Sequence, residues 1–398
     1  GEGKGMETGM KIRRCLIACG VALVTAGTVP LEVYASSPEF ARSEKEWARL
    51  QDDVLEYDEI EALIAEYNAT VQTNQLDLNE FKKKYGNTKD DISAKYRDMA
   101  EEIYASVEYP DADDPTYGYV VASVVMAEVQ AKNLMQQADD NLEDSEIIYL
   151  NYKQAEKTLV TVAQSNMVSY ARSQLQLQQA ELALKQAELA MTTANIRRDN
   201  GLATQVDVLN AQEALMTANR NIESARSGVE NVRQKLLVML GWKYDAKPEI
   251  RAVPKADINR IAGMNPQVDK EQAVENSYTR KVNQKKLKNA TANNTIESLK
   301  KTLADNEQKI GSSLVTNYQN VLAAKLAYDQ AAAEMDLENR NLRSLEMNFQ
   351  QGNVSRAELE NQQYVVQDKE LALQIADLNL FQSMETYDWA VNGLAGTS

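Results

Sequence analysis

The sequence predicts an all-α protein built from long antiparallel coiled-coil helical hairpins in two tandem repeats. Three observations lead to this fold class. Proline breaks helix interiors because it lacks a backbone N–H and clashes with the preceding turn, and it is absent from 116–247 and again after Pro266. Apolar residues over 208–239 are spaced alternately by three and four positions. A glycine turn with the same neighbours occurs twice, at Gly201 and Gly352.

Residues 1–35 are expected to comprise upstream residues and a signal peptide. Basic residues, a short apolar run and a small-residue cleavage pattern follow one another, as in secreted proteins; they are Lys11, Arg13 and Arg14, then 15–29, then 33–35. The predicted mature chain begins at Ser36 and is exported.

Composition argues against several classes of function. The formal net charge of −16 disfavours binding to nucleic acid. The chain has no His, and its two cysteines, Cys15 and Cys19, fall within the predicted signal peptide. His and Cys are the usual bases, nucleophiles and zinc ligands, so we expect no enzyme, no catalytic residues, no metal site and no cofactor.

Repeat 1 is predicted to span 36–241, with a long hairpin whose tip lies near Gly201. The heptads QAELALK and QAELAMT precede the turn, and the apolar seam over 208–239 follows it. A mean apolar period of 3.5 residues is typical of left-handed coiled coils. About 46 extra residues lie within 77–140, where the apolar segment 117–129 fits either a strand or a buried helix.

A linker over 242–266, marked by Pro248 and Pro254, is predicted to lead into repeat 2 at 267–398. The tip of repeat 2 lies near Gly352. Several positions around the two tips correspond: Gly201 with Gly352, Thr204 with Ser355, Asp207 with Glu358, and Asn210 with Asn361.

These tip residues, together with GLATQVDVLNAQEAL, VENVRQKLLVMLGW, YNATV and MNPQV, resemble the TolC-like outer-membrane efflux protein family. The resemblance covers roughly 55–395. It implies a homotrimer that forms a hollow helical cylinder. It also implies a membrane-fusion adaptor and an ABC or other pump as partners, and a location in the cell envelope. That location is either the outer membrane and periplasm or the wall side of a single-membrane cell.

The family also has a β-barrel, and there the sequence departs from the pattern. Membrane strands alternate apolar and polar residues, whereas 285–312 is polar and helix-like throughout. We therefore expect a TolC-like α-barrel protomer that lacks clear β-barrel strands.

The resemblance points to the tips as adaptor-docking sites, formed by Gly201, Leu202, Thr204, Gly352, Asn353 and Ser355. A residue without a side chain could open a groove for the adaptor, or could simply supply the positive φ of the turn. The matching acids, Asp207 and Glu358, are either an acidic ring at the tunnel mouth or helix caps. A ring would raise their pKa by like-charge repulsion, whereas capping is favoured by the helix dipole.

The function predicted from these features is a TolC-like component of an export system, a trimeric conduit that docks an adaptor through its tips. The alternative is a secreted coiled-coil scaffold that binds partners in the cell envelope and conducts nothing.

Overall fold

The computed structural model describes residues 42–398, so the predicted signal peptide and both cysteines lie outside the described residues. The chain divides into two units, residues 1–51 and 52–398. In the first unit the structure describes α3 (Glu44–Gln51), at whose start the Ser43 hydroxyl accepts a hydrogen bond from the Glu46 N–H. Everything that follows concerns the second unit.

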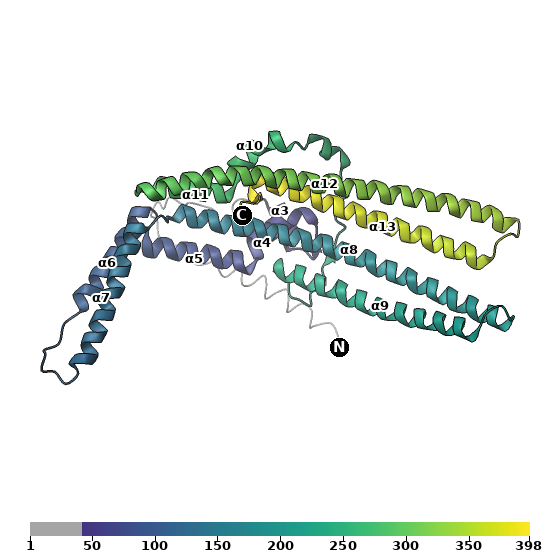
Figure 1. Cartoon of the computed structure of the whole chain (residues 1–398), viewed down its shortest axis with the longest axis horizontal. Coiled ribbons are helices and arrows are strands. Elements are labelled where there is room, and N and C mark those ends of the chain that lie inside the picture. Colours follow the sequence, from purple (N-terminus) through teal and green to yellow (C-terminus); the bar gives the residue numbers. More distant parts are fainter. Residues whose placement is uncertain (1–41) are drawn as a thin grey trace. The chain divides into compact units, whose positions relative to one another are not determined.

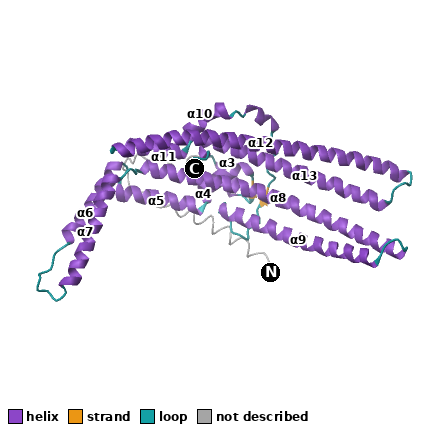
Figure 2. Cartoon of the chain, in the orientation of Figure 1, coloured by secondary structure: helices purple, strands orange, loops and turns teal. Residues whose placement is uncertain are grey.

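Two long helical hairpins dominate the second unit (Figure 1). They are formed by α8 (Ser145–Asp199) with α9 (Gln205–Met239), and by α12 (Asn293–Gln350) with α13 (Arg356–Trp389). The 55 residues of α8 extend about 80 Å at 1.5 Å per residue. The predicted all-α fold class is confirmed, because the described residues are almost entirely helical (Figure 2).

The four long helices lie side by side in the order α9, α8, α13, α12 (Figure 1). The α9 seam predicted from the sequence faces α8, with Val208, Ala218, Ile222 and Leu236 buried. Between the hairpins, Gln382 of α13 donates a hydrogen bond to Ser165 of α8 at 2.7 Å. This order leaves α9 and α12 at the two edges of a single helical layer.

An asparagine-capped helix precedes each long hairpin in the chain. Asn68 accepts hydrogen bonds from two N–H groups at the start of α5 (Ala69–Tyr85), which packs on α8. Asn265 does the same for α10 (Pro266–Asn276), which packs on α12. An asparagine side chain satisfies helix N–H groups that have no partner within the helix, which explains why YNATV and MNPQV are alike.

One core cluster lies where α10, α12 and α13 meet the π-type turn η3 (Ala390–Leu394). The buried residues there are Met264, Ala273, Ile310, Leu314, Val321, Leu380, Met384, Tyr387, Ala390, Val391 and Ala395. The segment between the repeats is held by a short β-strand pairing. Its strand β2 (Glu249–Ile250) pairs in parallel with β1 (Val54–Leu55), and the 3-10 turn η2 (Ile258–Gly263) follows.

The segments with unsettled or unusual sequences are helical. Residues 117–129 belong to α7 (Tyr117–Asp140), which forms a hairpin with α6 (Lys89–Ser106). Of the two alternatives for 117–129 the helix is right and the strand is wrong, but α7 is buried on one face only and exposes apolar residues on another. Residues 285–312 fall in α11 (Tyr278–Asn289), in α12 and in the turn between them. No helix among residues 42–398 has both the length and the apolar character needed to cross a membrane.

Candidate docking site at the hairpin tips

The first tip, residues 197–207, turns the chain from α8 into α9 through Gly201. The Leu202 N–H donates to the Arg197 carbonyl at 2.7 Å, and the Gly201 N–H donates to the Arg198 carbonyl at 2.9 Å. This pair of bonds is the Schellman motif, which requires a residue of positive φ. Gly201 supplies it with φ of 70°.

The second tip, residues 348–358, repeats this geometry. The Asn353 N–H donates to the Asn348 carbonyl at 2.9 Å, and the Gly352 N–H donates to the Phe349 carbonyl at 3.0 Å. Gly352 has φ of 75°. The correspondence between the tips therefore extends from residue type to individual backbone hydrogen bonds.

Both glycines face open space. A Cβ added at Gly201 or Gly352 would meet no other group within 4 Å. Glycine is needed at these positions for its backbone conformation and not because a neighbouring chain segment is close. A side chain that tolerates positive φ could therefore be added there without a clash inside the protomer.

The helices after the turns begin with the same capping box. The Asp207 carboxylate accepts hydrogen bonds from the Thr204 N–H and hydroxyl, each at 2.7 Å, and Thr204 accepts from the Asp207 N–H. At the second tip, Glu358 and Ser355 exchange the matching bonds. In the first box the acid is Asp, whereas the second has the more usual Glu.

These contacts determine the electrostatics of the two acids within the protomer. Hydrogen bonds from the backbone N–H and then the side chain of Thr204 lower the pKa of Asp207. The backbone and side chain of Ser355 lower the pKa of Glu358 in the same way. In one protomer both carboxylates act as helix caps. An acidic ring would require several copies, and it stays a prediction.

The two tips differ in surface character. The first exposes apolar side chains among its charged ones, with Leu202 exposed to 69% and Val206 also exposed. The second is polar, and Asn353 donates a hydrogen bond to the Gln351 side chain at 3.2 Å. The Arg198 side chain donates hydrogen bonds to Asp199 and Gln205 within its own tip. These bonds do not link the two hairpins.

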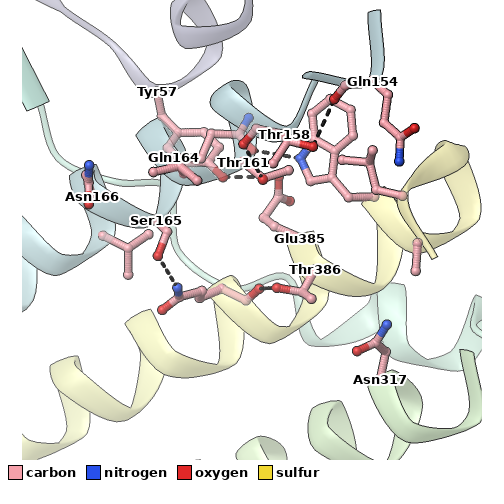
Figure 3. Close-up of a pocket in the computed structure, with 16 residues that line it drawn as sticks. Tyr57, Gln154, Thr158, Thr161, Gln164, Ser165, Asn166, Asn317, Glu385 and Thr386 are labelled. Atoms are coloured by element: carbon pink, nitrogen blue, oxygen red, sulfur yellow. Dashed lines mark hydrogen bonds between the residues drawn. The ribbon is translucent and has the colours of Figure 1, made fainter. Parts of the chain in front are cut away.

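A polar cleft that the sequence did not reveal lies between α8 and α13 (Figure 3). Its volume is about 450 Å³. Tyr57 donates to Glu385 at 3.3 Å, and burial is the largest cause of the raised pKa of Tyr57. Trp389 donates its indole N–H to Gln164 at 2.7 Å. No local sequence signal marks the cleft, because its residues come from segments far apart in the chain.

The cleft offers little for chemistry. Glu385 forms an ion pair with Arg260 at 3.2 Å, and Arg260 also contacts Asp388. The other residues that line the cleft have mainly neutral hydroxyl, amide and apolar side chains. Among residues 42–398, no group of three His, Cys, Asp or Glu side chains is arranged to hold a metal ion.

The chain matches no protein-family model and no curated protein, but solved structures resemble it. The outer-membrane channel OprN has 10% identity and a TM-score of 0.47, covering 88% of this chain and 92% of that chain. The CmeC outer membrane channel of Campylobacter jejuni has 10% identity and a TM-score of 0.46, covering 94% and 95%. The outer membrane protein VceC of Vibrio cholerae has 12% identity and a TM-score of 0.47, covering 87% and 98%.

The first two are described as outer-membrane channels and the third as an outer membrane protein. At such low identities the likeness concerns the fold alone. Whether this chain shares an activity or a partner with them has to be argued from its own residues.

Proposed function

We propose that this chain is a component of an export system in which three copies form a hollow helical conduit. The tips dock a membrane-fusion adaptor, which couples the conduit to an ABC transporter or another pump. The chain acts in the cell envelope after export, by conduction and gating rather than by chemistry.

The observation that carries this proposal is the open four-helix layer with apolar residues exposed on both edge helices. On α12 the exposed residues include Leu326, at 69%, and Leu337, at 54%. On α9 they include Val206, Leu209 and Met216. On each edge helix these residues recur along one face, and apolar residues gathered on one face commonly mark an interaction site.

The exposed edges support closure into a ring. The α9 edge and the α12 edge are different surfaces, so contact between them is head-to-tail. Head-to-tail contacts form a closed ring when the rotation between copies permits it. A scaffold that works as a single hairpin pair would not need apolar residues on both edges.

Oligomeric state and shape test the proposal directly. Light scattering on the full chain should give the mass of three chains of 44.5 kDa each. Negative-stain images should show a tube with a stain-filled centre. A monomer, or a solid coiled coil of two chains, would overturn the conduit and favour the scaffold.

Adaptor docking is tested at the tip glycines. Gly201→Asn with Gly352→Asn adds a side chain to open space, and Asn tolerates positive φ. We expect this double variant to lose capture of a membrane-fusion adaptor encoded beside the gene, with helical circular dichroism unchanged. Gly228→Asn in α9, also in open space but away from the tips, is the matched control. Undiminished capture by the double variant would refute docking at the tips.

A further inference from the structure

The α6–α7 hairpin has an apolar seam of its own. On α7 this seam consists of Val124, Ala131 and Ala138, which are buried and repeat every seven residues. On α6 the buried residues include Ile92 and Ala100. The two helices pack on each other, so this seam is already occupied.

A second seam lies on the opposite face of α7. Tyr119, Ala122, Met126, Val129 and Asn133 alternate in spacing by three and four, and all are exposed. The exposure reaches 82% for Tyr119, 74% for Met126 and 53% for Val129. Successive helix residues are about 100° apart, so Met126 lies about 200° from the buried Val124. We call these five residues the outer α7 stripe.

The spacing of the outer α7 stripe indicates a helix as its partner. A period of 3.5 residues keeps a stripe facing another helix in a left-handed supercoil. A lipid surface imposes no such period. Asn133 occupies the same heptad position as Tyr119 and Met126. A single buried Asn at such a position pairs with its equivalent on a parallel partner and sets the register.

The charge distribution favours a second copy of this chain as that partner. Acidic chains repel one another over most of their surfaces, and α6 exposes Asp98, Glu101 and Glu102. Between residues 117 and 138, however, α7 carries only two charged side chains, Glu128 and Lys132. Glu128 accepts a hydrogen bond from Tyr109 of its own hairpin at 2.9 Å. Two copies of the stripe can therefore meet without a run of opposed like charges.

We propose that the outer α7 stripes of neighbouring copies of this chain pack on one another around a shared axis, parallel and in register. The parallel arrangement rests on the proposed conduit, in which copies share one axis. The inference goes beyond that function, because it assigns the α6–α7 hairpin a role in holding copies together that the long hairpins do not provide.

Cysteine cross-linking tests the register. In the full chain carrying Cys15→Ser and Cys19→Ser, Met126→Cys should form a disulfide-linked pair of chains on mild oxidation. An interface holds two thiols at an effective concentration of about 1 mM. At a micromolar concentration of the chain, we therefore expect cross-linking at least about tenfold faster than for a free thiol. Ala94→Cys, exposed on α6, is the matched control. Equal rates for the two variants would overturn the inference.

Charged variants test the contact without oxidation. Met126→Glu with Val129→Glu changes only exposed side chains, so the protomer should keep its helical circular dichroism. Like charges at a desolvated contact raise the dissociation constant more than about tenfold. We therefore expect the fraction of dissociated chains to be at least about tenfold higher than for Ala94→Glu. If the double variant associates as the wild type does, the proposed contact between the outer α7 stripes is also wrong.

The outcomes separate this inference from the conduit. A trimer without faster Met126→Cys cross-linking keeps the conduit and overturns the stripe. Fast cross-linking in a two-chain species keeps the stripe contact and overturns the conduit. If the full chain floats with phosphatidylcholine vesicles, and Met126→Glu with Val129→Glu abolishes flotation, then lipid covers the stripe and the inference is wrong.

Discussion

At the scale of single residues, the tips show one arrangement built twice from different side chains. Thr204 with Asp207 and Ser355 with Glu358 form the same reciprocal hydrogen bonds. The local chemistry of turn and cap thus specifies each tip. It also accounts for both acids within the protomer without reference to a partner.

The lowered pKa values of Asp207 and Glu358 predict how stability changes with pH. A carboxyl group whose pKa is lower in the folded chain stabilises that chain at pH above its unfolded pKa. This contribution is lost as the pH falls through the folded pKa. Unfolded Asp and Glu titrate near pH 4, so the loss falls below about pH 4. The urea midpoint should therefore drop less between pH 5 and pH 3 in Asp207→Asn with Glu358→Gln than in the wild type.

Glu213→Gln, which removes an exposed acid from the body of α9, is the control and should behave like the wild type. A wild-type transition above pH 5 that the double variant removes would contradict capping. It would favour the acidic ring, in which like-charge repulsion raises the carboxyl pKa.

At the scale of elements, the matching asparagine caps have different surroundings. Asn68 is buried, and besides capping α5 it donates its side-chain N–H to the Met239 carbonyl at 2.9 Å. Asn265 is exposed, and its side chain caps α10 by accepting hydrogen bonds from the N–H groups of Gln267 and Val268. The same motif thus joins helices in repeat 1 and serves mainly as a cap in repeat 2.

This difference predicts that replacing the two asparagines lowers the free energy of unfolding by unequal amounts. Asn265→Ala should lower the free energy of unfolding by about 1 kcal/mol, which is typical for a lost cap. Asn68→Ala should lower it by roughly 2–4 kcal/mol, because the Met239 carbonyl also loses its partner. Chemical denaturation of the two variants side by side measures the difference. Equal losses would mean that the bond to Met239 contributes nothing.

At the scale of the whole molecule, the apolar residues on the edge helices are the strongest feature of the described chain. A burial argument within one protomer does not explain them, because Leu326 and Leu337 stay largely exposed. Association of copies would remove that surface from water and supply the hydrophobic free energy.

The role of the α12 edge in association can be tested with variants of that one helix. Leu326→Glu with Leu337→Glu should shift light scattering on the full chain from three copies towards one, while circular dichroism stays the same. Ala327→Glu is the control. Ala327 is exposed, and as the next residue after Leu326 it lies about 100° around α12, away from the stripe. Loss of association in the control alone, or in neither variant, would place the interface elsewhere.

The sequence by itself determined the long helices, their seams and both tips. These features depend on local physics: the proline-free stretches, the 3.5-residue period around Val208 and Ile222, and the turn and cap chemistry at Gly201 and Gly352. Each of these signals lies within a few helical turns of chain, so no distant contact was needed to predict them.

Only the tertiary structure decided the remaining features. The order of the four helices, the pairing of β1 with β2 and the polar cleft around Glu385 join segments that are far apart in sequence. The apolar segment 117–129 has apolar residues on two faces of a helix, and composition alone could not show which face another helix already covers. Local patterns specify which residues form a helix, whereas the face that stays exposed depends on packing between elements distant in the chain.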